Sequence, residues 1–403
     1  MPDQPVPQFC PTARELDDLE LLTTGALLPI TRFSEPGSPV TLTLPDGTSD
    51  ATLVELVDPE GLPLARVDTA TGEVTALTHH QHGPFRRLYV APAEVRQRHA
   101  GATFVPVTDA LTEGQLAELE TVDGPVALLA LVGTGTPALS PVATLRATLL
   151  AATRLGADVV AVPLASHGDP ETDHQLGVQV VATYAGDDPV HALTEPGDDD
   201  PWPDDVAAVV AADQPAPEDQ GLVLFFTGLS GSGKSTLARA LMDLVLERGE
   251  RTVTTLDGDV VRRHLSAGLT FSREDRETNI RRIGWVAAEI SRHGGLAVCS
   301  PIAPFAETRA QVREMVEAAG GAFFLVHVAT PLEECERRDR KGLYARARRG
   351  EIPDFTGISS PYEEPDDAAV RVDTTGRTIE DALDDVLVAL RESGHLDLTD
   401  ARP

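Results

Sequence analysis

The sequence predicts an α/β fold with parallel sheets and helices on both faces, and three observations support this prediction. Apolar runs at 222–227, 252–256, 296–300 and 322–328 alternate with helical stretches. A shorter unit of the same kind lies at 126–164. A glycine-rich phosphate-binding motif stands between the run at 222–227 and the helix that follows it. A parallel sheet needs a crossover between neighbouring strands, and a helix usually supplies it.

The elements of the shorter unit come in a clear order. Residues 126–132 are a continuous apolar run of strand length, and residues 141–155 repeat apolar side chains at the helical period. Residues 158–164 are a second apolar run. Strand, helix and strand in this order predict one βαβ unit. After the glycine-rich motif, residues 236–248 again show the helical period.

Four segments follow one another along the 403 residues. Residues 1–110 contain short apolar runs separated by turn signals, which indicates a small β-rich domain. Residues 111–194 contain the βαβ unit. Residues 195–220 are rich in proline and acidic residues and are predicted to be a linker with room for one short element. Residues 221–395 form the domain that carries the glycine-rich motif.

The composition argues against several kinds of partner. A formal net charge of −31 disfavours nucleic acid and anionic membranes, because phosphate-rich partners bind proteins that neutralise them. Residues 1–11 lack a targeting pattern, and nowhere do 18 apolar residues run together. Cys10, Cys299 and Cys335 are odd in number and lack metal-ligand spacing. We therefore expect a soluble cytoplasmic protein with reduced thiols.

The segment 228–235 reads Gly-Leu-Ser-Gly-Ser-Gly-Lys-Ser and satisfies the P-loop pattern G-x-x-x-x-G-K-[ST]. In this motif the backbone N–H groups hold phosphate, the lysine reaches the γ-phosphate, and the serine hydroxyl ligates Mg²⁺. The sequence therefore predicts that the chain binds ATP and Mg²⁺. The predicted ATP-binding residues of the motif are Gly228, Leu229, Ser230, Gly231, Ser232, Gly233, Lys234, Ser235 and Thr236.

Lysine occurs at only two positions, Lys234 and Lys341, in a chain with 33 Lys and Arg residues. An ammonium is a compact point charge, whereas a guanidinium is a wide planar fork that does not fit a tight phosphate cradle. Lys234 is the lysine of the P-loop. Lys341 lies in the basic stretch 337–349, which we expect to form a helical lid over the transferred phosphate.

Two carboxylates follow the second predicted strand of the C-terminal domain. Asp257 and Asp259 should lie at the edge of the sheet where ligands of open α/β sheets bind. Further along, Arg276, Asn279 and Arg282 recur at a spacing of three and fall on adjacent faces of one helix. Taken alone, this spacing is also typical of a surface helix with ion pairs.

Together these residues closely resemble the adenylyl-sulfate kinase family over residues 220–390. The motifs that carry the resemblance are GLSGSGKST, LDGD-x-VR, FS-x-x-DR-x-x-NIRR, C-x-x-RD-x-KGLYA-x-AR and FTGI-x-S-x-YE. The resemblance implies a kinase that phosphorylates the 3′-hydroxyl of adenosine 5′-phosphosulfate (APS) with ATP to give PAPS in sulfate assimilation. It also implies a P-loop NTPase-type fold for this domain.

The resemblance assigns roles to particular residues. It implies that Asp259 orients or deprotonates the 3′-hydroxyl, and that Asp257 and Ser235 place Mg²⁺ and its waters. Lys234 and Lys341 would meet the phosphates, which makes Lys234, Asp257, Asp259 and Lys341 the implied catalytic set. Arg338 would pack against the adenine of ATP, and Phe271 and Phe355 would enclose the adenine of APS. The implied APS-binding residues are Asp259, Arg262, Phe271, Arg276, Asn279, Ile302, Lys341 and Phe355.

Two positions depart from the family pattern. Many relatives carry a serine in an Ile-Ser-Pro segment, sometimes phosphorylated, whereas here residues 301–304 read Pro-Ile-Ala-Pro with Ala303 at that position. A covalent intermediate there is impossible, and we expect direct in-line transfer. Arg340 replaces a usual proline in the lid and adds positive charge, so we expect activity to survive.

The N-terminal half resembles a different enzyme, one whose product is APS. Residues 12–33 resemble the start of ATP sulfurylase, which makes APS from ATP and sulfate. The resemblance implies a PUA-like domain followed by a partial nucleotidyltransferase-like domain. Where sulfurylases carry Q-T-R-N-P-x-H-x-x-H, residues 133–142 read G-T-G-T-P-A-L-S-P-V, and a later G-R-D-H-type signature is absent. We therefore expect no sulfurylase activity, and leave regulation, dimerisation, docking of a true sulfurylase, or no function open.

Two other functions compete with APS phosphorylation. A P-loop kinase of gluconate or a nucleoside shares the motif but needs neither the two phenylalanines nor Arg262, Arg276 and Asn279. A regulatory protein that only senses PAPS usually has a degenerate P-loop, whereas the P-loop here is intact. The predicted partners are ATP and APS; a homodimer and an association with an ATP sulfurylase stay open.

Overall fold

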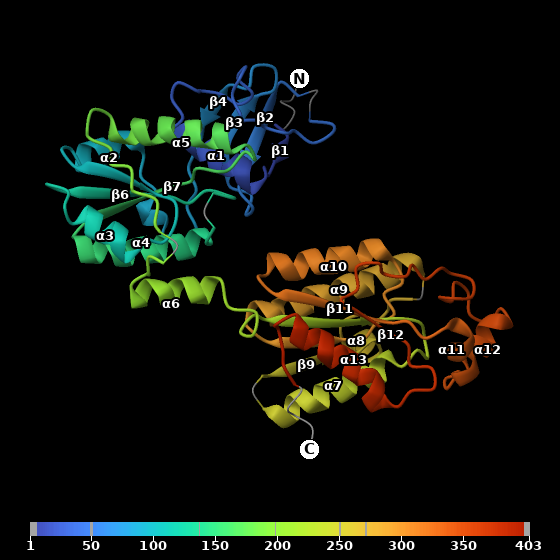
Figure 1. Ribbon diagram of the computed structural model, residues 1–403. Helices are drawn as coiled ribbons and strands as arrows, with labels where there is room; N and C mark the ends of the chain where they lie inside the picture. The colour runs from blue at the N-terminus through green and yellow to red at the C-terminus, as the bar shows by residue number, and fades with distance from the viewer. Residues whose placement is uncertain are drawn as a thin grey trace. The chain divides into compact units, whose positions relative to one another are not determined.

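The chain forms two compact units, Met1–Gln214 and Pro215–Pro403, each with helices around its own strands (Figure 1). No helix among the described residues is both long and apolar enough to cross a bilayer. The computed structural model describes residues 6–48, 51–136, 138–197, 199–249, 251–270 and 272–398.

The C-terminal unit is built on a five-stranded sheet in the order β12-β11-β8-β10-β9. Every neighbouring pair in it is parallel. The four strands predicted for this unit are confirmed to within one residue at either end, and a fifth, β12, was not predicted. The strands are β8 (Leu222–Thr227), β9 (Val253–Leu256), β10 (Leu296–Cys299), β11 (Ala322–Val328) and β12 (Val370–Val372).

Helices cover both faces of this sheet (Figure 1). Successive side chains of a strand point to opposite faces, so central strand β8 divides its apolar residues between two cores. Leu222, Leu224 and Phe226 pack in one core with α7 (Lys234–Arg248) and α13 (Ile379–Glu392). Val223 and Phe225 pack in the other. That second core includes buried residues of α9 (Arg273–Arg292) and α10 (Ala306–Ala318).

Three short helices stand at the C-terminal ends of the strands. Helix α8 (Gly258–His264) follows β9, and α11 (Leu332–Arg338) and α12 (Leu343–Arg348) follow β11. The basic stretch predicted as a helical lid spans α11 and α12. Its two helices are separated by residues 339–342, the last of which, Gly342, has a φ of 64°, a left-handed conformation that glycine adopts without strain.

The N-terminal unit contains two small sheets. A four-stranded sheet has the order β1-β2-β3-β4, and a three-stranded parallel sheet has the order β5-β6-β7. One core joins them, with Leu56, Phe104 and Leu129 among its fully buried members. The strands are β1 (Gln8–Phe9), β2 (Leu53–Val57), β3 (Pro63–Asp68), β4 (Val74–Ala76), β5 (Thr103–Val107), β6 (Val126–Leu131) and β7 (Asp158–Val162).

Two of the predicted segment boundaries differ from the structure. A division at residue 110 would separate β5 from its partner β6, so the three-stranded sheet begins earlier than expected. The acidic stretch 195–220 contains a helix, α6 (Asp204–Asp213), whose Val206 and Val210 pack in one core with residues of α4. Much of that stretch therefore belongs to the N-terminal unit. The helices of this unit are α1 (Ala13–Thr24), α2 (Pro92–Arg98), α3 (Glu113–Leu119), α4 (Pro141–Leu155), α5 (Pro170–Ala185) and α6, with a short 3₁₀ helix η1 (Arg86–Leu88).

Candidate active site

A cleft of about 900 Å³ lies at the C-terminal ends of the parallel strands in the C-terminal unit. This is the edge at which an open α/β sheet binds its ligands. The structure brings residues from all five motifs of the sequence, and from the segment 301–304, together around it. The predicted site residues that line the cleft are Ser230, Lys234, Ser235, Asp257, Arg262, Arg276, Asn279, Ile302, Lys341 and Phe355.

The P-loop joins β8 to α7 and needs glycine where its backbone is most crowded. Gly228 has a φ of 147°, and a Cβ on it would lie 2.5 Å from the carbonyl oxygen of Val328. Gly233 has a φ of 103° and precedes α7, whose first N–H groups face the loop. Lys234 is 9% exposed, and its Nζ donates a hydrogen bond to the carbonyl of Leu229 at 3.2 Å. The lysine thus reaches back across its own loop.

Three side chains hold the P-loop from behind. The hydroxyls of Thr330 and Thr374 donate to the carbonyl of Ser232 at 2.9 and 2.8 Å. The hydroxyl of Tyr344 donates to the carbonyl of Ser230 at 2.8 Å. Sequence reasoning missed these residues. Each threonine stands two positions after the end of a strand, β11 or β12, and that placement is the signal that points to them.

Oxygen atoms converge where the P-loop meets β9. The hydroxyl of Ser235 lies 3.5 Å from that of Ser300, which lies 3.4 Å from a carboxylate oxygen of Asp257. Mg²⁺ prefers oxygen ligands and retains several waters, so it uses only one or two protein groups in such sites. The oxygen donors of Ser235 and Asp257 therefore fit the Mg²⁺ that the sequence predicts.

The far side of the cleft is basic and partly aromatic. Arg276 donates to the hydroxyls of Thr356 at 2.9 Å and Ser360 at 3.2 Å, and burial lowers its pKa. Asn279 is buried, and its Oδ1 has no hydrogen-bond partner among the described residues. The ring of Phe355 packs edge-on against Tyr344, with ring centres 5.0 Å apart. An anionic ligand with a flat ring would find charge, an amide and an aromatic face here.

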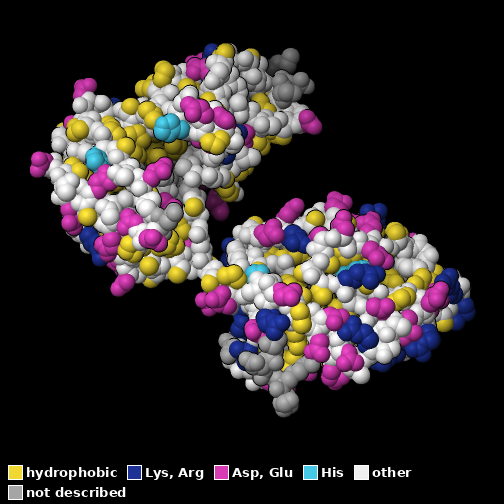
Figure 2. Space-filling model, viewed as in Figure 1, with side chains coloured by type: hydrophobic (Ala, Val, Ile, Leu, Met, Phe, Trp, Pro, Cys, Tyr) yellow, Lys and Arg dark blue, Asp and Glu magenta, His cyan; other side chains and the backbone are white. Residues whose placement is uncertain are grey.

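Positive charge also gathers at the lid. Figure 2 shows Lys and Arg side chains clustered at the end of the C-terminal unit where Figure 1 draws α11 and α12. Lys341 and Arg346 of this region line the cleft. In a chain of net charge −31, a local cluster of this kind is needed to hold a polyanion.

Of the predicted site residues outside the P-loop, Arg338 lies away from the cleft, and two others are not among the described side chains. The P-loop residues that do not line the cleft are Gly228, Leu229, Gly231, Ser232, Gly233 and Thr236. Arg338 does not line the cleft but donates to the hydroxyl and carbonyl of Thr374 at 2.8 and 3.0 Å. With Arg337 it lowers the pKa of Glu334 to about 2 through hydrogen bonds. Phe271 and the side chain of Asp259 lie outside the described residues, so the aromatic pair and the Asp259 role stay predictions.

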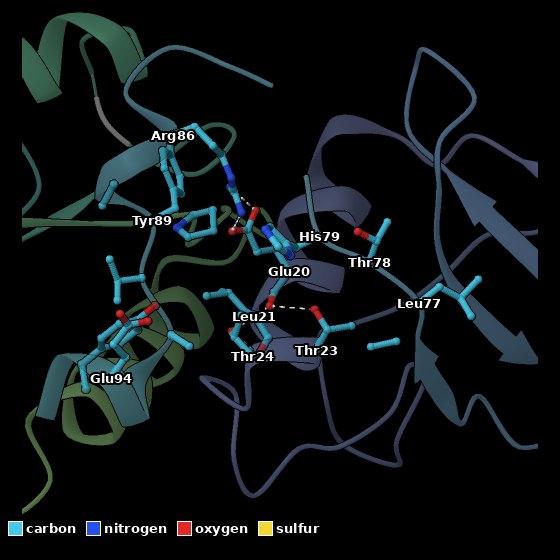
Figure 3. Close-up of a pocket in the computed structure, with 16 residues that line it drawn as sticks. Glu20, Leu21, Thr23, Thr24, Leu77, Thr78, His79, Arg86, Tyr89 and Glu94 are labelled. Atoms are coloured by element: carbon cyan, nitrogen blue, oxygen red, sulfur yellow. Dashed lines mark hydrogen bonds and ion pairs between the residues drawn. The ribbon is translucent and has the colours of Figure 1, made fainter. Parts of the chain in front are cut away.

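The N-terminal unit has a smaller cavity of about 480 Å³ between its two sheets (Figure 3). Arg86 and Glu20 face each other in it and form two hydrogen bonds of 2.8 and 2.6 Å. The Arg86 guanidinium also lies 4.9 Å from the ring centre of Tyr89, and burial raises the pKa of that tyrosine to about 12. The Arg86 guanidinium is therefore already paired with a carboxylate within this cavity.

Residues of the segment 133–142, which stands where sulfurylases carry their signature, form hydrogen bonds within the N-terminal unit. The carboxylate of Asp17 on α1 accepts hydrogen bonds from the backbone N–H and the hydroxyl of Thr134 at 2.7 and 2.6 Å. The N–H of Ser166 donates to the carbonyl of Thr134 at 2.9 Å, which ties the loops after β6 and β7 together. A Cβ on Gly133 would lie 2.1 Å from the backbone of Leu164. An anion at this strand end would have to displace the Asp17 carboxylate.

Comparison with known proteins agrees with the C-terminal site. The family model for adenylylsulphate kinase matches residues 220–373. The chain is 28% identical to the hexameric APS kinase from Thiobacillus denitrificans, with a TM-score of 0.73 over 98% of this chain and 94% of that chain. It is 45% identical to the Mycobacterium tuberculosis APS kinase CysC, with a TM-score of 0.41 over 43% of this chain and 98% of that chain.

Curated relatives of this chain are named for a different activity, sulfate adenylyltransferase. Proteins called sulfate adenylyltransferase from Neosartorya fischeri and Aspergillus fumigatus are each 47% identical over 193 residues, which is 48% of this chain. The match spans 34% of those relatives, about a third of their length. The family match at 220–373 contains the residues that line the P-loop cleft. The similarity to an APS kinase extends over nearly the whole chain. The C-terminal unit of this chain therefore belongs to the adenylylsulphate kinase family.

Proposed function

We propose that the C-terminal unit transfers the γ-phosphoryl group of ATP to the 3′-hydroxyl of APS and so makes PAPS. One observation carries the proposal: a single cleft joins a P-loop to a basic and aromatic acceptor half. Lys234 and Ser235 belong to the first, and Arg276, Asn279 and Phe355 to the second. A kinase needs this juxtaposition because its catalysis consists largely of positioning and charge neutralisation.

The P-loop half would hold the donor. The N–H groups at the start of α7 would bind the β-phosphate, and the Lys234 ammonium would follow the γ-phosphate as it moves. Ser235 and Asp257 would hold Mg²⁺, which supplies positive charge between the β- and γ-phosphates. The Mycobacterium tuberculosis APS kinase CysC was solved in complex with AMPPNP and APS, which is consistent with a donor and an acceptor in one cleft.

The opposite half would hold the acceptor. Arg262 and Arg276 would meet the phosphosulfate, and Lys341 would approach the phosphates from the lid. Phe355 would stack on the adenine, since an aromatic face can hold a base without reading its edge. Asp259 would orient or deprotonate the 3′-hydroxyl. Transfer would be direct and in line, because Ala303 has no hydroxyl to carry phosphate.

The N-terminal unit would have no sulfurylase activity. Its loop at 133–142 lacks the arginine and histidines of the sulfurylase signature, and Asp17 supplies a negative charge where a phosphate would bind. The relatives named sulfate adenylyltransferase make the opposite function worth testing. We propose that this unit consists of a PUA-like domain and a partial nucleotidyltransferase-like domain, and that the protein is cytoplasmic. The role of the unit would be self-association or docking of an ATP sulfurylase.

A panel of acceptors tests the proposed kinase function. The full chain, with ATP and Mg²⁺, would be supplied in turn with APS, gluconate and adenosine, and release of ADP would be measured. We expect release only with APS. Faster release with gluconate or adenosine would assign another acceptor, and tight binding of PAPS without any turnover would make the unit a sensor.

A further inference from the structure

The loop after β10 holds a strained backbone against the cleft. Ala303 has a φ of 45°, a left-handed conformation that residues other than glycine rarely adopt. The following residue is Pro304, and a residue before proline normally prefers extended backbone. Pro301, Ile302, Ala303 and Pro304 all line the cleft. Strain at a binding site persists only where surrounding contacts enforce it, so the contacts of this loop are informative.

Arg309 of α10 makes the central contact. Its side chain donates to the carbonyl of Ala303 at 2.8 Å and to the carbonyl of Glu363 at 2.9 Å. The hydroxyl of Thr227 donates to the neighbouring carbonyl of Ile302 at 2.6 Å. The N–H of Glu363 donates to the carbonyl of Pro304 at 2.8 Å. Each of the three carbonyls of residues 302–304 therefore accepts a hydrogen bond from a neighbouring segment, and these bonds fix the backbone of the loop.

Burying the Arg309 guanidinium costs free energy, which a residue that only supported a loop would not need. It is 3% exposed, and it forms no ion pair with any residue that the structure describes. Burial lowers its pKa, although several acidic groups lie in the wider surroundings. Burying a guanidinium without a carboxylate is costly, and an apolar residue of similar volume would normally stabilise a core better. The charge and the two directed hydrogen bonds thus call for a role beyond packing.

The two segments that Arg309 joins form two walls of the acceptor half. One wall is the strained loop 301–304. The other is the segment 354–363, which contains the Phe355 aromatic face and the Thr356 and Ser360 hydroxyls that hold Arg276. Because one side chain bonds both, it fixes how far apart they stand. The P-loop on the opposite side has its own supports in Thr330 and Thr374.

We propose that Arg309 is a positioning residue that holds Ala303 in its left-handed conformation and sets the width of the acceptor half of the cleft. The inference deepens the proposed function, on which it rests, by separating the determinants of APS binding from those of ATP binding. Arg309 acts through Ile302, Phe355 and Arg276 and does not itself touch the substrate.

Four variants of the full chain test this role. Arg309→Met removes both bonds, and Arg309→Lys keeps the charge and can reach only one carbonyl. Ala303→Gly in the Arg309→Met background relieves the strain, because glycine adopts this φ freely. Arg251→Met is the matched control: Arg251 also donates to two backbone carbonyls, those of Gln220 and Gly294, at the opposite edge of the sheet.

We expect Arg309→Met to raise KM for APS by about tenfold while KM for ATP changes by less than about twofold, as loss of a charged hydrogen bond predicts. Arg309→Lys should lie between Arg309→Met and wild type. The added Ala303→Gly substitution should lower KM for APS again by about threefold, because the loop then needs less support. Arg251→Met should reduce thermal stability and leave both KM values unchanged.

Hydrogen–deuterium exchange provides a readout that needs no catalysis. Arg309→Met should speed exchange in peptides covering 300–306 and 357–364, and Arg251→Met should not. If wild type makes no PAPS yet this difference appears, the proposed function fails and the positioning role stands. Unchanged exchange in both peptides, or equal rises in KM for APS and ATP, would overturn the positioning role. If Arg309→Met does not fold, Arg309→Lys decides by the same two measurements.

Discussion

Both lysines of the chain, Lys234 and Lys341, line the same cleft, one from the P-loop and one from the lid. The P-loop lysine is buried among backbone atoms, where a compact ammonium fits and a planar guanidinium does not. The lysine of the basic stretch 337–349 is exposed and lines the same cleft. An otherwise arginine-rich chain thus keeps lysine at two positions that face the proposed transferred phosphate.

Ala303 leads to a prediction about the chemical route. The methyl side chain carries no nucleophile, so phosphate should pass from ATP to the acceptor without a phosphorylated protein. Incubation of the protein with γ-labelled ATP and no APS should leave it unlabelled, as judged by autoradiography and intact mass. Ser300 is the nearest hydroxyl in the loop, and Ser300→Ala is the control. Stoichiometric label that passes on to APS and disappears in Ser300→Ala would contradict direct transfer.

Asp17 leads to a prediction about pH and the N-terminal unit. Burial raises the pKa of its carboxyl from 3.8 to about 6, despite two hydrogen bonds from Thr134. Because the folded unit holds this proton more tightly than the unfolded chain, the resulting stability is complete below pH 3.8 and is lost as pH rises through about 6. The shift corresponds to about 3 kcal/mol.

The measurement uses the chain's two tryptophans, one in each unit. In a Trp285→Phe background, Trp202 fluorescence reports denaturant unfolding of the N-terminal unit. Asp17→Asn should flatten the fall in unfolding free energy between pH 4 and pH 7, by a few kcal/mol at most. The exposed Asp123→Asn serves as the charge control. An equally steep fall in Asp17→Asn would mean that another group controls this pH dependence.

The motif residues could be predicted from sequence because their chemistry is local, and the supporting residues could not. Lys234 and Ser235 belong to a contiguous pattern that fixes their surroundings. Arg309, Thr330 and Thr374 acquire their partners only through tertiary folding, and no spacing along the chain encodes this. The packing of Arg338 against the adenine stays a prediction; in the structure its guanidinium donates a hydrogen bond to the hydroxyl of Thr374.

At the scale of elements, the parallel sheet places the site. Strands β8, β9 and β10 end at one edge, so the loops that follow them, although distant in sequence, meet around one cleft. The P-loop is then fixed from behind by residues that follow β11 and β12. The P-loop and its two supporting threonines, Thr330 and Thr374, therefore form one hydrogen-bonded group at this edge of the sheet, here called the cradle.

This cradle predicts a selective effect on ATP. The double variant Thr330→Val, Thr374→Val removes both hydroxyl donors to the Ser232 carbonyl while keeping side-chain volume. Loss of the two bonds should loosen the P-loop and raise KM for ATP by about tenfold, with KM for APS changed little. Steady-state kinetics with each substrate varied in turn provide the test. Thr375→Val, an exposed neighbour, is the control, and an unchanged KM for ATP in the double variant would contradict the role.

The strands and helices of regular period were the most predictable elements. β8 and α4 were predicted at their observed bounds, since both have uninterrupted patterns. β12 has only three residues and was missed, because so short an apolar run cannot be told from a loop. The acidic stretch 195–220 was predicted as a linker with room for one short element; that element is α6, whose Val206 and Val210 pack against buried residues.

At the scale of the whole molecule, each unit has its own hydrophobic core. The cores of residues 215–403 contain no residue of the N-terminal unit, and every described residue of the proposed kinase cleft lies after residue 228. The cores of the N-terminal unit are likewise its own. Two units built in this way should fold and act separately.

A prediction about the kinase reaction follows from this division: it should not need the N-terminal unit. A fragment of residues 215–403 should keep the kinase reaction, and the full chain should make no ATP from APS and pyrophosphate. Circular dichroism of the fragment and a luciferase assay of the full chain provide the measurements. A folded fragment without kinase activity would mean that the N-terminal unit contributes to the site. ATP formation by the full chain would show that the loop at 133–142 is catalytic.

The most direct test of the kinase assignment is the quantity of PAPS formed from APS and ATP by the purified full chain, compared with Lys234→Ala. Wild type should form PAPS with the new phosphate on the 3′-oxygen, as read by phosphorus NMR. Lys234→Ala, folded by circular dichroism, should be slower by about a thousandfold, because a contact to charge that develops in the transition state is lost. Absence of PAPS with wild type, or equal turnover in Lys234→Ala, would contradict the assignment.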